Sequence, residues 1–248
     1  MRDSRTVIGK ILPFCFFLFV AVLGFGFRHG PDAGTHGDAY SNHRNAVNAH
    51  TSAFYGLYDS LQLGALDLSR EAYQMAIKGF LALEMAGQIQ NSGVLSIIDF
   101  SLPSSKPRLF VLDMRNGRLL FNTFVAHGRN SGTLMATRFS NRRNSYMSSL
   151  GFYLTGQSFI GRHGYSLRLE GMEKGWNDNA SQRAIIMHPA RYVSEQHIRQ
   201  CGFLGRSEGC PAIPEQVHTA IINRIKGGSC LFMYAPDSRY VQRIDAFS

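Results

Sequence analysis

Cysteine and acidic residues are scarce in this 248-residue chain, which has four cysteines and 17 Asp or Glu residues against 26 Lys or Arg. The formal net charge is therefore +9, and nearly all of it lies in residues 61–248. Such a basic protein favours polyanionic surroundings, for example nucleic acid, anionic lipid or a carboxylate-rich polymer. Long basic runs are also missing, and Arg142-Arg143 is the only adjacent basic pair. This argues against a nucleic-acid-binding surface.

Long apolar runs are limited to one, Ile11–Phe27, which contains no charged residue and follows Arg2, Arg5 and Lys10. A basic flank before an apolar run near the N-terminus is typical of an export signal. Seventeen residues are at the short end for crossing a bilayer, and no convincing small-x-small cleavage site follows. We therefore expect a protein exported to the periplasm or cell envelope, with residues 11–27 either cleaved or kept as an inner-membrane anchor.

Only three cysteines follow this segment: Cys201, Cys210 and Cys230. Because three is odd, at least one thiol has no intrachain disulfide partner. A disulfide between Cys201 and Cys230 stays open at this point. A zinc site built from Cys201, Cys210, His188 and His197 is disfavoured, because close ligand pairs are missing. No metal ligand is therefore predicted.

The most informative cysteine is Cys210, in the segment LGRSEGCPAI (residues 204–213). Gly209 and Pro211 on either side indicate a tight turn that leaves the cysteine amide free to point outward. His188 lies 22 positions upstream in AIIMHPA, a strand-like run. A neutral imidazole could take the thiol proton, and turn amides could stabilise an oxyanion, which suits nucleophilic acyl transfer. A structural cysteine in a Gly-Pro turn is the alternative.

The chain divides into four predicted regions. They are a signal peptide or anchor (1–27), a polar linker (28–56), a helical extension (57–93) and a catalytic domain (94–248). Apolar residues at helical spacing predict helices in the extension; these are Leu66, Tyr73, Ile77, Phe80, Leu81 and Met85.

From Val94 onward the apolar pattern changes to that of strands. We predict strands at residues 95–100, 108–113, 119–126, 151–155, 166–169, 184–187 and 230–234. Asn116-Gly117 is a strong hairpin signal between the second and third of them. Helices are expected at Ser194–Cys201 and Pro214–Lys226. The predicted fold is mostly β, sandwich- or barrel-like, with short helices and the N-terminal helical extension.

With these segments in view, the chain resembles the L,D-transpeptidase catalytic domain family, in the murein L,D-transpeptidase branch. His188 after a strand and Ser207-Glu208-Gly209-Cys210 match the family's His and S-x-G-C signature. The resemblance extends over about half the chain, in the segments FVAHGRNSG, SSLGFYLTG, HGYSLRLEG, GWNDNA and KGGSCLF.

The resemblance implies a β-rich enzyme that attacks peptidoglycan stem peptides and passes the acyl group through a thioester to an amine. Carried over to this sequence, Cys210 is the nucleophile and His188 the general base. Ser207 belongs to the signature turn, and Gly209 shapes the oxyanion hole with the Cys210 amide. No metal or organic cofactor is implied. His188 is oriented by a backbone carbonyl, as in the family, or by Asp178.

Further residues are predicted to contact the substrate. His127 and His163 are each followed by glycine and are expected to line the cleft. Arg206 is a candidate replacement for the arginine that familiar members carry soon after the cysteine. Glu208 stands where those members have histidine, and an ionised carboxylate there opposes thiolate formation unless it faces solvent or binds Arg206.

Two other functions remain in view. Water as the acceptor in place of an amine would make the enzyme an L,D-carboxypeptidase or endopeptidase. A thiol silenced by Glu208 would leave a non-catalytic module that binds the cell wall.

Overall fold

The computed structural model describes residues 51–245, so the apolar run Ile11–Phe27 lies outside the described residues. Residues 51–60 are helical and overlap the end of the predicted linker. The 3-10 helix η1 (Leu63–Leu66) and the α-helix α2 (Arg70–Met85) follow. In the part of the chain that the structure covers, no helix combines the length and the apolar character needed to cross a membrane.

Helix α2 begins after Ser69, whose hydroxyl accepts a hydrogen bond from the Ala72 N–H at 3.2 Å and caps the first turn. Tyr73, Ile77 and Phe80 form its buried face, as the helical spacing predicts. The predicted apolar position Met85, at the helix end, is instead exposed. The buried face of α2 belongs to the same hydrophobic core as the strands, so the helix is an integral part of the fold.

One eight-stranded sheet organises the fold, in the order β3-β2-β1-β8-β4-β5-β6-β7. All neighbours are antiparallel except the pairs β1–β8 and β6–β7. The strands are β1 (Val94–Asp99), β2 (Leu109–Asp113), β3 (Arg118–Thr123), β4 (Gly151–Gly161), β5 (Gly164–Gly171), β6 (Ile186–Pro189), β7 (Ala212–Ile213) and β8 (Cys230–Tyr234). The predicted mostly β fold with short helices is confirmed.

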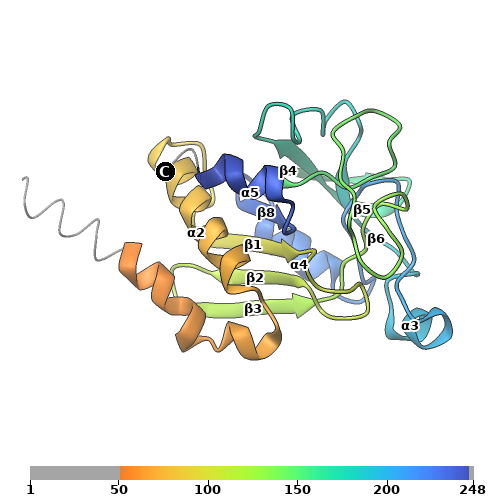
Figure 1. Ribbon diagram of the computed structural model, residues 1–248, viewed down its shortest axis with the longest axis horizontal. Coiled ribbons are helices and arrows are strands. Elements are labelled where there is room, and N and C mark those ends of the chain that lie inside the picture. Colours follow the sequence, from red (N-terminus) through yellow and green to blue (C-terminus); the bar gives the residue numbers. More distant parts are fainter. Residues whose placement is uncertain (1–50, 246–248) are drawn as a thin grey trace, which may run out of the picture. The chain divides into compact units, whose positions relative to one another are not determined.

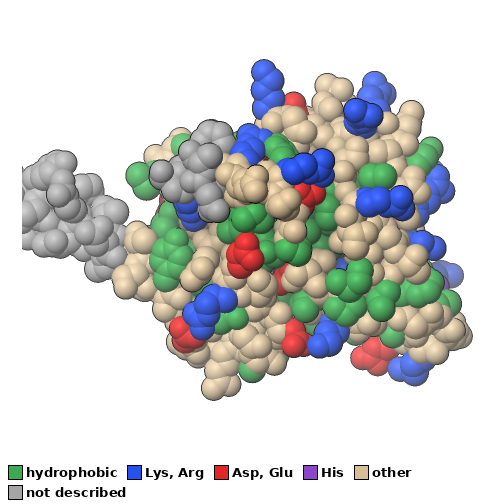
Figure 2. Space-filling model, viewed as in Figure 1, with side chains coloured by type: hydrophobic (Ala, Val, Ile, Leu, Met, Phe, Trp, Pro, Cys, Tyr) green, Lys and Arg blue, Asp and Glu red, His purple; other side chains and the backbone are tan. Residues whose placement is uncertain are grey.

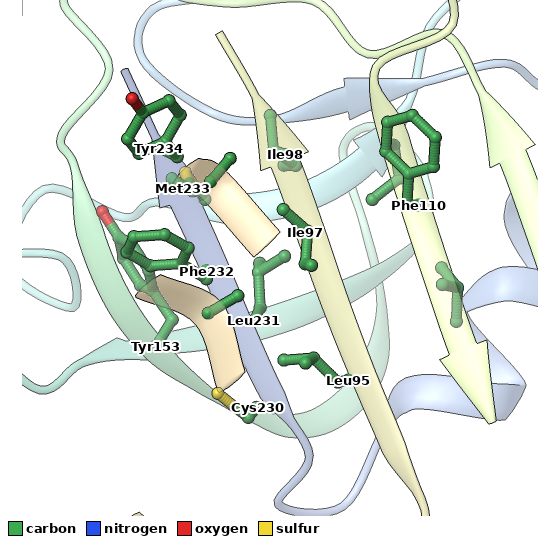
Figure 3. Close-up of a cluster of buried hydrophobic side chains, with 14 of the residues drawn as sticks. Leu95, Ile97, Ile98, Phe110, Tyr153, Cys230, Leu231, Phe232, Met233 and Tyr234 are labelled. Carbon is green, nitrogen blue, oxygen red and sulfur yellow. The ribbon is translucent and has the colours of Figure 1, made fainter. Parts of the chain in front are cut away.

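Three helices follow the first strands: α3 (Glu195–Cys201), α4 (His218–Ile225) and α5 (Ser238–Asp245). In Figure 1, α2 lies in front of the sheet and α4 behind it. Every residue of β1 is buried, because helices cover both faces of this part of the sheet. Figure 3 shows the resulting core, in which side chains of β1, β2, β4 and β8 interdigitate.

The structure adjusts several predicted boundaries. Asn116-Gly117 does lie between β2 and β3, where Gly117 has φ +57 and the Asp113 carboxylate accepts from the Asn116 N–H at 3.0 Å. The strand predicted at 184–187 starts only at Ile186, because Ala184 has φ +52 and breaks the extended backbone. Helix α4 starts only at His218, after a turn at residues 215–217, and the Pro214 carbonyl accepts from the His218 N–H at 3.1 Å.

The chain after β3 crosses to the other end of the sheet. Ala126 pairs with Ala212 of β7, and Gly128 pairs with Ser207 in the segment that precedes it. These contacts bring the two outermost strands of the sheet close together and surround the segment that carries Cys210.

Basic side chains are spread over the face shown in Figure 2, and acidic ones are fewer. On this face the basic residues form no continuous stripe, in keeping with the scattered basic residues of the sequence.

Candidate active site

Ser207 closes the turn that carries Cys210. The Ser207 hydroxyl accepts a hydrogen bond from the Gly209 N–H at 3.0 Å and donates to the Cys210 carbonyl at 2.6 Å. Gly209 has φ +124, and a Cβ added there would meet the Met147 carbonyl oxygen at 2.7 Å. Glycine is therefore required for both backbone conformation and space. Together these contacts fix the direction in which the thiol leaves the turn.

The register of the short strand β7 brings His188 beside this turn. His188 pairs with Ala212 in the parallel β6–β7 ladder, and its N–H lies 3.4 Å from the Pro211 carbonyl oxygen. Strand pairing thus brings His188 close to the Cys210 turn, although 22 positions separate the two residues in the sequence.

His188 has the tautomer of a general base. Its Nδ1 lies 2.9 Å from the Pro189 carbonyl oxygen, and a carbonyl only accepts, so Nδ1 carries the proton and Nε2 keeps a lone pair. Burial lowers the pKa of His188 and the charges of His163 and Arg162 lower it further, whereas the Pro189 hydrogen bond acts in the opposite direction. The ring is therefore neutral near pH 7 and able to take a proton.

Of the two predicted partners that could orient His188, Asp178 is the wrong one. Asp178 instead accepts from the Asn141 side chain and from the Gly175 N–H, each at 2.7 Å. The backbone carbonyl of Pro189 performs the orienting role.

The Cys210 thiol is half-buried and hydrogen-bonded to the Ala184 carbonyl oxygen at 3.7 Å. Burial raises its pKa, the Glu208 charge adds to this, and a backbone contact with Ile186 and the charge of Arg183 oppose it. The resting thiol is consequently protonated, and its reaction with a carbonyl requires a base.

Arg183 is a site residue that no sequence pattern indicates. Its guanidinium donates to the Ser140 carbonyl at 2.8 Å, to the Met147 carbonyl at 2.5 Å and to the Ser149 hydroxyl. It lines the same cleft as Cys210, and its charge favours the thiolate. Arg183 therefore has two kinds of interaction: hydrogen bonds to the segment that precedes β4, and an electrostatic effect on the thiol.

A cleft of about 720 Å³ opens over the thiol and the imidazole. The predicted residues Ser207, Arg206, Glu208 and His163 line it together with Cys210 and His188. Its charged lining is strongly basic, with guanidinium groups from Arg129, Arg162, Arg168, Arg183 and Arg206.

His163 reaches the cleft from the turn between β4 and β5. Its exposed ring stacks on His188, with the ring centroids 4.3 Å apart and an interplanar angle of 24°. It contacts the proposed base directly, a closer placement than the sequence predicts.

The prediction that His127 lines the cleft is wrong. Its side chain is fully buried, and its Nδ1 lies 2.8 Å from Nη2 of Arg108, itself fully buried. Burial and the Arg108 charge lower the pKa of His127 to about 4, with the Gly132 backbone opposing them. The His127 carbonyl accepts from the Ser207 N–H at 3.0 Å, so this residue supports the cysteine turn from behind.

Of the two alternatives raised by the sequence, Glu208 faces solvent, with its side chain 64% exposed, and it does not bind Arg206; the nearest cation is Arg129, at 3.8 Å. Arg206 instead lies over the Phe203 ring, 5.5 Å from its centroid, and approaches the Gly132 carbonyl at 3.4 Å. It borders the cleft, as predicted for a substrate-binding residue, without forming an ion pair with Glu208.

Gly209 is predicted to shape an oxyanion hole together with the Cys210 amide, and the two N–H groups differ in whether they are free to donate. The Gly209 N–H is already bonded to the Ser207 hydroxyl, whereas the Cys210 N–H makes no hydrogen bond within residues 51–245. Gly209 thus contributes shape, and the Cys210 N–H is the donor still available to a developing oxyanion.

The other two cysteines within residues 51–245 are unpaired. Cys201 is exposed on α3 and Cys230 is buried in β8, so the disulfide left open by the sequence is not formed. Neither residue lines the cleft.

Comparison with known proteins identifies the family to which the chain belongs. A model of the L,D-transpeptidase catalytic domain matches residues 65–234, well over half of the chain. The protein therefore belongs to the L,D-transpeptidase catalytic domain family. The match includes α2, which agrees with the single core shared by that helix and the sheet. No curated protein matches the sequence.

Among solved structures, the chain is similar to an L,D-transpeptidase from Mycobacterium smegmatis (12% identity, 58% of this chain and 59% of that chain, TM-score 0.35). It is also similar to one from Stackebrandtia nassauensis (12% identity, 67% and 65%, TM-score 0.35). A third is Bd1075 from Bdellovibrio bacteriovorus (11% identity, 62% and 54%, TM-score 0.37). The chain spans less than two thirds of each of these proteins.

Proposed function

We propose that the protein is an L,D-transpeptidase that acts on peptidoglycan stem peptides through a thioester on Cys210. The observation that carries this proposal is that, in a member of this family, a thiol and a neutral imidazole line the same cleft. The arginines of the cleft suit a donor peptide that bears free carboxylates.

The reaction begins when His188 Nε2 takes the thiol proton as the sulfur attacks the carbonyl of the donor peptide bond. The oxygen then carries negative charge, for which the Cys210 N–H is the available donor. Collapse breaks the carbon–nitrogen bond, and the departing D-alanine amine receives the proton from His188. An acceptor amine then attacks the thioester, which forms an amide and restores the thiol.

The test uses the full-length protein with purified muropeptides that carry tetrapeptide stems, followed by mass spectrometry. We expect a protein adduct on Cys210 and crosslinked dimers. Shortened monomers without dimers would favour the hydrolytic alternative. An unmodified protein with unchanged muropeptides would contradict the proposal, and so would full activity of Cys210→Ala.

A carbapenem offers an independent probe of the thiol, because its strained carbonyl reacts with an activated cysteine. We expect the mass of the intact protein to increase by one molecule of the drug, and the increase to be lost in Cys210→Ala. An unchanged mass in the wild type would count against an accessible, activated thiol.

We also propose that the protein works outside the cytoplasm, in the periplasm or cell envelope, since its proposed substrate is there. The basic flank and apolar run of residues 1–27 support export. Fusion of these residues to a reporter that is active only after export should yield activity, and removal of residues 11–27 should abolish it. Fractionation then distinguishes a cleaved signal from a retained anchor.

A further inference from the structure

Glu208 has an unusual place in the active site. Among residues 51–245 it is the only acidic residue that lines the cleft, which also has five arginines. It also stands two positions before the proposed nucleophile. Burial is the main reason for the raised pKa of the Cys210 thiol, and the Glu208 charge raises it further. An anionic donor would gain nothing from this carboxylate, so its presence calls for another binding partner.

The carboxylate of Glu208 is available to such a partner. Its side chain is 64% exposed, and its distance of 3.8 Å from Arg129 is too long for a hydrogen bond. Arg129 is itself held over the Tyr146 ring, 4.0 Å from the centroid. Neither carboxylate oxygen accepts a hydrogen bond from any residue of the range 51–245.

The backbone that carries Glu208 is rigid, although the side chain is exposed. Ser207 fixes the turn on one side of it, and the Ser207 carbonyl accepts from the Arg129 N–H at 2.8 Å. A ligand that binds the Glu208 carboxylate is therefore placed next to the cysteine without reordering of the loop.

Glu208 also stands where two hollows meet. Together with Arg183 and Ala184 it borders both the main cleft and a smaller pocket of about 170 Å³. The Ala184 carbonyl is the group that binds the thiol. A second molecule that enters along the smaller pocket thus reaches Glu208 near the sulfur, beside a donor that occupies the cleft.

We propose that Glu208 binds the ammonium group of the acyl acceptor, so that the Cys210 thioester is resolved by a charged amine in preference to water. This inference rests on the proposed thioester chemistry and names the residue that selects its acceptor. An ammonium ion is the complement of a carboxylate with free lone pairs, and it would also reduce the repulsion between Glu208 and a thiolate.

The step that follows is an ordinary aminolysis. The bound ammonium releases one proton to solvent and becomes the free amine, whose nitrogen attacks the thioester carbonyl. The carbon–nitrogen bond forms and the carbon–sulfur bond breaks. The second proton of the amine passes to His188 and from there to the leaving sulfur, which restores the Cys210 thiol.

The experiment compares the wild type, Glu208→Gln and the control Glu195→Gln, each as the full-length protein. Glu195 is a matched control because it is an exposed carboxylate in an ion pair, on α3 and outside the cleft. A tetrapeptide muropeptide serves as donor, and two nucleophiles are supplied in turn at neutral pH. Glycine carries a charged ammonium, whereas hydroxylamine is uncharged.

For glycine, we expect the ratio of amide product to hydrolysed product to fall about fivefold to tenfold in Glu208→Gln, as for the loss of a partly exposed ion pair. The ratio for hydroxylamine should stay unchanged in the same variant, which a general distortion of the turn would not allow. Glu195→Gln should match the wild type with both nucleophiles.

Each other outcome is decisive. An equal fall with both nucleophiles, or no fall with glycine, overturns the role of Glu208 while the thioester chemistry stands. A wild type that forms the adduct but only hydrolyses it, at every glycine concentration, does the same. A wild type that forms no adduct overturns the proposed function, and the inference with it.

Discussion

The two histidine-bearing segments on either side of β7 make an instructive pair. Ala212 pairs with Ala126 on one side and with His188 on the other, so His127 and His188 flank the same short strand. Both rings are buried, and burial is the main reason that the pKa of each is lowered. Their tautomers are nevertheless opposite.

The difference follows from the atom that each Nδ1 meets. In His188 it meets the Pro189 carbonyl, which only accepts, so the lone pair is on Nε2. In His127 it meets the Arg108 guanidinium, which only donates, so the proton is on Nε2. A buried imidazole becomes a base or a structural support according to this partner and to whether it borders the cleft.

The largest effect should come from Cys210, in the turn just before the strand that lies between the two histidines. Cys210→Ala should abolish adduct formation and lower turnover of tetrapeptide muropeptides by about 10⁴-fold or more, as is typical when a nucleophile is removed. Cys201→Ala is the matched control, because that thiol is exposed on α3 and outside the cleft. Chromatographic assay of the muropeptides measures both. Substantial activity without Cys210 would contradict its role as nucleophile, and His188 would then have no thiol proton to accept.

Substitution of each histidine tests the comparison directly. His188→Asn should lower turnover by about 10²- to 10⁴-fold, since a general base is lost. His127→Asn keeps an acceptor for Arg108 and lies outside the cleft, so turnover per folded molecule should change little. The same muropeptide assay, normalised to folded protein by circular dichroism, measures both. Equal loss of turnover in the two variants would mean that the histidines do not differ in role.

Acid should reveal the structural histidine through stability. The pKa of His127 falls from 6.5 to about 4 on folding. Between these pH values the His127 imidazole is protonated in the unfolded chain and neutral in the folded one. Its contribution to stability is complete above pH 6.5 and decreases by about 3 kcal/mol as the pH falls to 4. His188 contributes in the same direction.

Urea unfolding at several pH values measures this contribution. His127→Asn should show a shallower loss of stability in acid than the wild type, because the substituted residue does not titrate. Identical pH profiles for the two proteins would contradict the buried, neutral state of His127.

The smallest effect concerns Arg183. Its positive charge lowers the pKa of the Cys210 thiol, whereas the negative charge of Glu208 raises it. Arg183→Met should raise the pKa of the Cys210 thiol and slow its alkylation by iodoacetamide at neutral pH about tenfold. Arg183→Lys keeps the charge and should restore much of the rate. The pH dependence of alkylation separates the two variants. Equal alkylation rates in Arg183→Met and the wild type would mean that Arg183 does not affect the thiol and serves only to bind residues 140–149.

Much of this architecture is visible in the sequence. Runs of Val, Ile, Leu and Phe predict the buried strands, and Asn116-Gly117 predicts the hairpin between β2 and β3. The turn at Cys210 is also visible, because Gly209 and Pro211 constrain its backbone. These features depend on neighbouring residues only, and local chemistry suffices to predict them.

The rest depends on contacts between distant segments. His127 and His163 are both followed by glycine, yet one is sealed behind the cysteine turn and the other stacks on His188. Arg183 lines the site next to Ala184, whose φ of +52 is a conformation that its sequence does not signal. Likewise, the pairing of Glu208 with Arg129 follows from the bridge between Gly128 and Ser207, which no local pattern predicts.

The position of β8 has a consequence for how the protein is made. This strand is the last of the eight in the chain, yet it lies between β1 and β4. Leu95 of β1, for example, pairs with Cys230 of β8. During synthesis the two halves of the sheet therefore remain unjoined until almost the whole chain has emerged. Folding that depends on such distant partners is slow and leaves strand edges open to association with other chains. A truncation just before β8 would accordingly spare every residue of the proposed active site and still leave it without a framework.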